Sequence, residues 1–185
     1  MLTTLLLWTQ LAMAALPPPL QLSPADEATL AKGEAVIRDN GDGMAIGIVN
    51  VKATPEALWT QVLNVEPRVE EVGPSTLCTI NSRTQDTMNV TWGAGMMGMS
   101  VTFHLDYVID HANKVLSFDL DRSRENDIGH SRGSYQVLPH PDGSRLIYRS
   151  EDDPNSKVPK WMRAMLTGRP LQDQMHGIRK RAEAN

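Results

Sequence analysis

Hydrophobic and polar residues alternate through the middle of the chain, most clearly between Met97 and Ile109. The apolar and aromatic side chains there occupy one set of alternate positions: Met97, Met99, Val101, Phe103, Leu105 and Tyr107. The small or polar side chains occupy the other set: Gly98, Ser100, Thr102, His104 and Asp106. Because successive side chains of a β-strand point to opposite faces, this pattern predicts a strand with one apolar face and one polar face.

The same alternation predicts strands on both sides of this one, for a sheet of about seven strands. Their ranges are Met44–Val51, Leu77–Arg83, Asp86–Trp92, Val115–Leu120, His130–Pro139 and Ser144–Ser150. The links between them are short and rich in turn residues, as in Pro141-Asp142-Gly143, so neighbouring strands are predicted to be antiparallel. On the shared apolar face we expect Met88, Val90, Trp92, Leu116, Phe118, Leu120, Tyr135, Val137, Leu146 and Tyr148.

Helices are predicted before, between and after these strands, at about Pro24–Arg38, Pro55–Asn64 and Pro159–Ala184. Ser23 and Thr54 are the expected caps of the first two helices, and a proline suits the first turn of each. Gly168 and Pro170 predict a kink or break inside the last helix.

Only the last helix is long enough to cover the apolar face, and its apolar side chains recur at helical spacing: Trp161, Met162, Met165, Leu166, Met175 and Ile178. A curved sheet around one helix often leaves its interior unfilled, and an apolar hollow is the usual form of a small-molecule site. The predicted ligand contacts are Met88, Val90, Trp92, Met97, Met99, Val101, Phe103, Tyr107, Phe118, Tyr135, Trp161, Met162, Met165 and Arg169. Tyr107 and Arg169 are the candidate anchors for a polar head group. A filled, methionine-rich core without a hollow stays open as the alternative.

Three segments resemble matching parts of one protein superfamily. Val49–Trp59 is similar to its first strand and first helix, Gly133–Tyr148 to its paired late strands, and Val158–Met162 to the start of its long terminal helix. This is the START, polyketide cyclase–dehydrase and coenzyme Q-binding (SRPBCC) superfamily. The resemblance implies an α+β helix-grip fold over residues 44–185, in which a curved antiparallel sheet wraps around the C-terminal helix.

The resemblance also implies a cavity for a sterol, phospholipid, quinone, polyketide or similar apolar molecule. Some members transport or present such a ligand, and others are enzymes. We therefore expect binding of a lipid or other hydrophobic small molecule. Two alternatives stay open: a cyclase or dehydratase acting on a polyketide-like substrate, and a module whose groove binds a partner. One departure from the family pattern is residues 65–71, where Pro67 aligns but the family's aromatic residues are missing.

Residues 1–15 have the short apolar run of a secretory signal peptide, and Ala12-Met13-Ala14 fits its cleavage pattern. They predict export to the periplasm or secretion, with an uncleaved N-terminal anchor as the alternative. Residues 16–43 are predicted to form a linker and the first helix, ahead of the START-like domain. No later segment is apolar for long enough to span a bilayer. We therefore expect any contact with a membrane to be transient.

Composition and candidate chemistry favour a binder over an enzyme. The chain has 185 residues, a net charge of −4 and a pI of about 5.7, which argues against nucleic acid as a partner. Cys78 is the only cysteine, so no internal disulfide can form. His104 and Asp106 could pair, but both are on the polar face and are expected to be exposed. No metal-ligand spacing is present, and neither a cofactor nor a catalytic residue is predicted.

Overall fold

The structure, a computed structural model, describes residues 17, 19–39, 43–73, 75–96, 98–152 and 169–184. Its elements in chain order are α1 (Pro24–Ala31), β1 (Val36–Asp39), β2 (Met44–Val51), α2 (Pro55–Leu63), α3 (Arg68–Glu71), β3 (Ser75–Arg83), β4 (Thr87–Met96), β5 (Met99–Asp110), β6 (Val115–Leu120), β7 (Ser131–His140), β8 (Gly143–Asp152) and α5 (Arg169–Glu183). The predicted signal peptide at 1–15 and the predicted start of the last helix, 159–168, lie outside the described residues.

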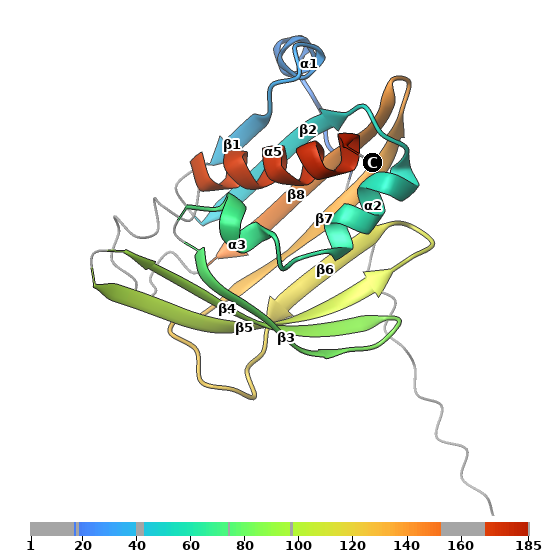
Figure 1. The fold of residues 1–185 in the computed structure, drawn as a ribbon. Helices are drawn as coiled ribbons and strands as arrows, with labels where there is room; N and C mark the ends of the chain where they lie inside the picture. Colours follow the sequence, from blue (N-terminus) through green and yellow to red (C-terminus); the bar gives the residue numbers. More distant parts are fainter. Residues whose placement is uncertain are drawn as a thin grey trace, which may run out of the picture.

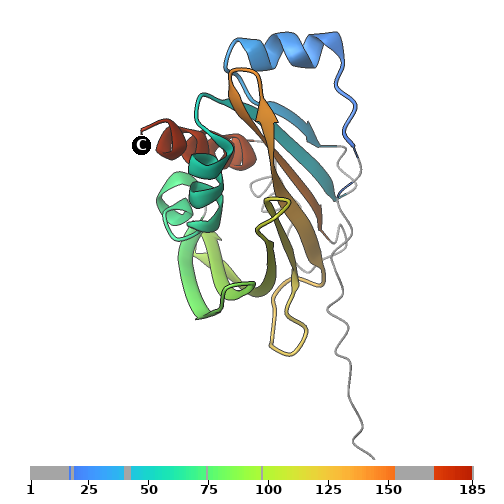
Figure 2. The same cartoon turned by 90° about the vertical axis from the view of Figure 1, so that its right-hand side faces the viewer.

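The strands form one eight-stranded antiparallel sheet in the order β1-β2-β8-β7-β6-β5-β4-β3. The sheet is strongly curved, and α2, α3 and α5 lie on its concave side (Figures 1 and 2). This arrangement confirms the predicted α+β class, the antiparallel sheet and the C-terminal helix.

Strand β1 corrects the prediction for the first helix, which was expected to continue to Arg38. Helix α1 ends at Ala31, and Gly33 follows with a φ of +78°, a left-handed conformation that glycine adopts without strain. Val36–Asp39 then pairs with β2 at the edge of the sheet. The sheet therefore has one strand more than predicted, since the chain turns at Gly33 and its β-branched residues extend the sheet.

Helix α1 packs on the convex face of the sheet (Figure 2). Its buried Leu30 lies in a small apolar cluster with Ile48 of β2 and Ile147 of β8. From the same face, Arg145 Nη2 pairs with Glu27 Oε2 at 2.7 Å. Within the described ranges, no helix combines the length and the apolar character needed to cross a bilayer.

The concave face carries the apolar residues that the alternation predicted. Strand pairing places Tyr107 opposite Met88 on one side and opposite Phe118 on the other. The buried members of this face from β4 to β8 include Met88, Val90, Trp92, Leu105, Tyr107, Leu116, Phe118, Leu120, Tyr135, Val137 and Leu146. They form one continuous cluster, and removing it from water is a major source of stability.

Helix α5 covers this face at β2. Its buried side chains are Leu171, Met175, Ile178 and Ala182, which confirms the predicted inward position of Met175 and Ile178. A Cβ on Gly47 of β2 would lie 3.2 Å from Met175 Cγ, so glycine at this position lets the helix approach the strand closely. The other predicted inward residues of this helix, Trp161, Met162, Met165 and Leu166, lie outside the described residues, as does Gly168 of the predicted kink.

Gly133→Ala is expected to destabilise the fold by about 3 kcal/mol. A Cβ there would lie 2.1 Å from the Arg149 carbonyl oxygen and 2.6 Å from Phe118 Cζ, so both the strand pairing and the ring would have to shift. Urea unfolding measures the change in the free energy of unfolding. Gly73→Ala is the control, because a Cβ at Gly73 meets nothing within 4 Å. Equal stability of the two variants would contradict the close approach at Gly133.

Candidate functional site

Four aromatic side chains from neighbouring strands meet on the concave face. They are Tyr107 of β5, Phe118 of β6, Tyr135 of β7 and Tyr148 of β8, and we call them the aromatic cluster. The ring centroids are 5.8 Å apart for Tyr107 and Phe118, 6.1 Å for Phe118 and Tyr135, and 4.8 Å for Tyr135 and Tyr148. The pairing of the four strands thus produces a continuous aromatic surface.

The tyrosine hydroxyl groups of the cluster are neutral. Trp92 Nε1 donates to the Tyr107 oxygen at 3.1 Å, and Gln174 Nε2 on α5 donates to the Tyr135 oxygen at 3.0 Å. Burial raises the pKa of both tyrosines above the usual value. The cluster therefore combines apolar ring faces with a few neutral polar atoms, which is the composition of a typical small-molecule site.

Tyr148 is deep in the protein and is still partly accessible. Burial raises the pKa of its hydroxyl well above the usual value, yet the side chain is only half-buried. Phe103, another residue of the concave face, is also half-buried. Tyr148 and Phe103 therefore keep accessible surface on the concave side of the sheet.

Arg68 of α3 adds a charge to this side of the sheet. Its side chain is 0% exposed, and its Cζ lies 4.5 Å from the centroid of the Tyr135 ring. Nη2 donates to the Val62 carbonyl oxygen at 2.5 Å. The helix α3 is a single turn, and it directs Arg68 inward while its neighbour Glu70 is exposed. The aromatic cluster thus has a cation in contact with one of its rings.

Asp152 is a second ionisable side chain on this face. The predicted strand ended at Ser150, but β8 extends to Asp152, which follows Tyr148 and Ser150 at alternate positions. Its carboxyl is hydrogen-bonded to the side chains of Ser131 and Ser150. Burial nevertheless raises the pKa of Asp152 above the usual value. This carboxyl can therefore keep its proton at a higher pH than an exposed aspartate does.

The structure brings together most of the predicted ligand contacts that it describes. One core cluster contains Met88, Val90, Trp92, Tyr107, Phe118 and Tyr135, and Phe103 packs against it. Val101 is buried in a smaller cluster with Ala94, against Ile128. Met97, the side chain of Met99, and Trp161, Met162 and Met165 lie outside the described residues.

The structure adds a cation that the sequence did not point to, and the role of Arg169 as an anchor stays a prediction. Arg169 is exposed at the start of α5, whereas Arg68 is buried against the aromatic cluster. Arg68 was missed because it stands in residues 65–71, which depart from the family pattern, with charged residues on both sides. Its spacing carried a signal, since the buried residues Val62 and Val65 precede it at intervals of one helical turn.

His104 is also a correction. It lies on the convex face as predicted, but it is buried, because the segment 121–130 covers it. Its Nδ1 is 2.9 Å from Thr91 Oγ1, and its backbone N–H donates to Asn126 Oδ1 at 2.7 Å. Asp106 instead accepts from Asn89 Nδ2 at 2.6 Å. In the part of the chain that the structure describes, no three His, Cys, Asp or Glu side chains are grouped closely enough to bind a metal ion.

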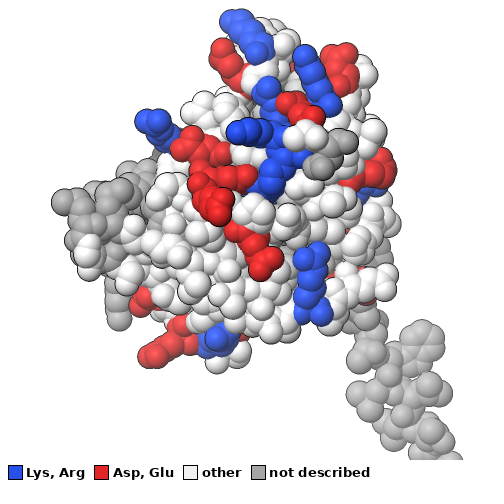
Figure 3. All heavy atoms as spheres, in the orientation of Figure 1, with Lys and Arg blue, Asp and Glu red and all other residues white. Residues whose placement is uncertain are grey.

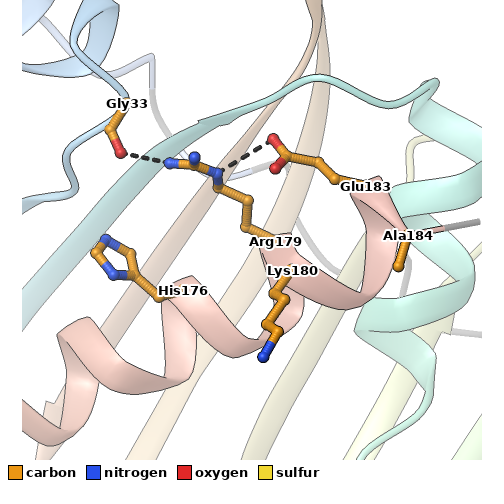
Figure 4. A pocket seen from close by; sticks show the side chains of 6 residues that line it. All are labelled: Gly33, His176, Arg179, Lys180, Glu183 and Ala184. Atoms are coloured by element: carbon orange, nitrogen blue, oxygen red, sulfur yellow. Dashed lines mark hydrogen bonds and ion pairs between the residues drawn. The ribbon is translucent and has the colours of Figure 1, made fainter.

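A separate hollow of about 470 Å³ lies on the outer surface, between α5 and the turn after α1 (Figure 4). It is lined by Gly33, His176, Arg179, Lys180, Glu183 and Ala184. Arg179 donates to the Gly33 carbonyl oxygen and, through Nε, to Glu183 Oε1 at 3.1 Å. Acidic and basic side chains stand side by side on the face seen in Figure 3. This polar surface hollow is distinct from the aromatic cluster.

Comparison with known proteins gives evidence at the level of the fold. No protein-family model matches the sequence, and no curated protein matches it. A STAR-related lipid transfer protein from Xanthomonas axonopodis is 10% identical with a TM-score of 0.60, over 80% of this chain and 98% of that one. A START superfamily protein from Mycobacterium smegmatis is 18% identical with a TM-score of 0.59, over 76% of this chain and 97% of that one. The Zhui aromatase/cyclase from a Streptomyces species is 14% identical with a TM-score of 0.53, over 80% of this chain and 88% of that one. The chain therefore has the helix-grip fold of START superfamily proteins.

Asp152→Asn is expected to stabilise the protein at neutral pH relative to the wild type, by an amount that shrinks as the pH falls. Because the pKa of Asp152 is raised on folding, the folded state binds a proton that the unfolded chain has lost. Wild-type stability therefore falls as the pH rises from about 4 toward the raised pKa, by about 1.4 kcal/mol for each pH unit between them. Thermal unfolding of both proteins at about pH 4 and about pH 7 measures the difference. A difference that is the same at both pH values would contradict the buried position of this carboxyl.

Proposed function

We propose that this protein binds a lipid or another hydrophobic small molecule in an internal space between the concave face of the sheet and its covering helices. The observation that carries the proposal is the aromatic cluster, in which Tyr148 is deep but still accessible. Export after removal of residues 1–15 and transient membrane contact belong to the same proposal, and they rest on the sequence alone.

Apolar burial supplies the driving force for such binding. Each Å² of apolar surface removed from water contributes about 25 cal/mol, and the ring faces of the aromatic cluster offer that surface. The neutral hydroxyl groups add few desolvation costs. Support also comes from the matching folds, one of which belongs to a protein that is named for lipid transfer.

A second candidate function is acid catalysis on a polyketide-like substrate, and Asp152 is the observation that favours it. A carboxyl with a raised pKa suits a general acid, because it holds its proton to a higher pH than an exposed aspartate does. The carboxyl would donate that proton to a hydroxyl group that leaves as water, and the resulting carboxylate would accept the α-proton of the substrate as the C=C bond forms, which regenerates the acid. Tyr148 lies on the same face of β8 as Asp152 and is hydrogen-bonded to Ser150. The substrate would bind beside Tyr148. An aromatase/cyclase is among the proteins of matching fold.

The two candidate functions are distinguished by an activity assay, because only an enzyme turns over a substrate. If the protein is a dehydratase, it converts a β-hydroxy ketone to the conjugated enone, and Asp152→Asn lowers the rate by at least about 100-fold. The absorbance of the enone measures the reaction, and Ser117→Ala on another strand serves as the control. If the wild type gives no enone above the uncatalysed rate, the catalytic candidate is wrong and binding alone remains.

Binding is tested by substituting opposite faces of β5. Phe103→Asp puts a charge on the concave face and is expected to weaken binding of a neutral fluorescent apolar dye by about tenfold or more. Val108→Asp changes the convex face, where Val108 is 46% exposed, and is expected to leave the affinity unchanged. Dye titration gives both affinities, and circular dichroism checks that both variants fold.

Two results would contradict the binding proposal. The first is equal dye affinity of the two folded variants, since it would show that the dye does not reach the concave face. The second comes from extracting the purified wild type with organic solvent and analysing the extract by mass spectrometry. If the protein from several expression hosts carries no extractable molecule and does not bind the dye, it is a stable fold without a ligand, and the binding proposal is wrong.

A further inference from the structure

The guanidinium of Arg68 is a fully buried cation inside an apolar interior. It lies between the end of α2, whose Val62 carbonyl it contacts, and the ring of Tyr135 on β7. Its charge also acts on Tyr107 of β5 and on Cys78 of β3. This position is the one where a ligand on the aromatic cluster would meet it.

Most of the hydrogen-bonding capacity of this guanidinium is unused. Nη2 bonds to Val62, but Nε and Nη1 are buried with no acceptor among the described residues. Glu71, on the same single-turn helix, pairs with Arg181 of α5 instead. Arginine stays protonated at any physiological pH, so the charge cannot be removed by titration.

The contact with Tyr135 does not replace the missing partners. A ring face attracts a cation, but it offers no oxygen atom to the N–H groups. Leaving a buried charged donor without an acceptor is more costly than leaving a neutral one. Native proteins therefore rarely keep such a group unless a ligand, an ion or water completes it.

We propose that the natural ligand is an apolar molecule with one anionic oxygen group, a carboxylate or a phosphate, which accepts hydrogen bonds from Nε and Nη1 of Arg68. This inference rests on the proposed binding function and deepens it. The apolar body of the ligand packs on the aromatic cluster, and its anionic head neutralises the buried cation. Several anionic oxygens on one atom can satisfy donors that point in different directions.

The head group reaches the guanidinium by displacing a neighbour. Arg68 itself has no accessible surface, whereas Cys78, which is close enough to feel its charge, is half-buried on the concave side of β3. We therefore place the approach of the head group on the side of Cys78. A neutral lipid could occupy the aromatic cluster as well, but it would leave Nε and Nη1 unsatisfied.

Three ligands with the same alkyl chain test the inference: dodecanoate, dodecyl phosphate and dodecanol. Isothermal titration calorimetry is done on the full chain after its bound lipid has been extracted. The wild type is expected to bind at least one of the two anions about 10- to 100-fold more tightly than dodecanol. The anion that binds with the higher affinity shows whether the natural head group resembles a carboxylate or a phosphate.

Arg68→Met is expected to abolish this preference and to leave the affinity for dodecanol within about threefold of the wild type. Arg83→Met is the matched control, because Arg83 is an exposed arginine at the end of β3. It is expected to keep the full preference for the anion. If Arg68→Met does not fold, the pH dependence of the wild type replaces it: dodecanoate affinity must fall as the fatty acid is protonated, while dodecanol affinity stays constant.

The failures of the two proposals are distinguishable. Equal binding of dodecanol and both anions by the wild type, or an unchanged preference in folded Arg68→Met, would overturn the role of Arg68 while leaving the binding function intact. Dodecanoate binding that is insensitive to pH would overturn it as well. If none of the three ligands binds to the wild type, the proposed function itself fails.

Discussion

The fold is stable only if the apolar face of the sheet is shielded from water, and no single described helix covers that face completely. Helix α5 packs on β2, where Gly47 allows a close approach, while α2 contacts β7 and β8 and α3 contacts β3. The cover is therefore assembled from three separate helices, α2, α3 and α5 (Figure 1). Packing is tight where a glycine meets a helix, and side chains such as Phe103 and Tyr148 keep accessible surface elsewhere on the same face.

The polar groups on this face differ in how they adapt to an apolar environment. The tyrosine hydroxyls stay neutral, and Asp152 can become neutral by keeping a proton, which burial favours. Arg68 has no such option, because its guanidinium does not lose its proton. For this reason Arg68 constrains the ligand, whereas Asp152 is compatible with either of the two candidate functions.

Local pattern was enough to predict every strand except β1, together with the faces of these strands. The alternation at Val101, Leu105 and Tyr107 identified the buried side of β5, because the pleat of a strand fixes the direction of every second side chain. Local pattern failed where long-range contacts decide the outcome. His104 was expected to be exposed, but a loop more than a dozen residues further along the chain covers it and bonds to its backbone.

By itself, the sequence determined the strands β2 to β8, where α1 and α2 begin, and which face of the sheet is apolar, since these follow from residue spacing and capping within a few residues. The tertiary structure decided that Val36–Asp39 joins the sheet, that Asp152 is half-buried at the end of β8, and that Arg68 rather than Arg169 lies on the aromatic cluster. The physical reason is that the burial of a charged side chain depends on what packs over it. In this protein the covering elements come from parts of the chain that are far apart in sequence, as Arg68 and Tyr135 show.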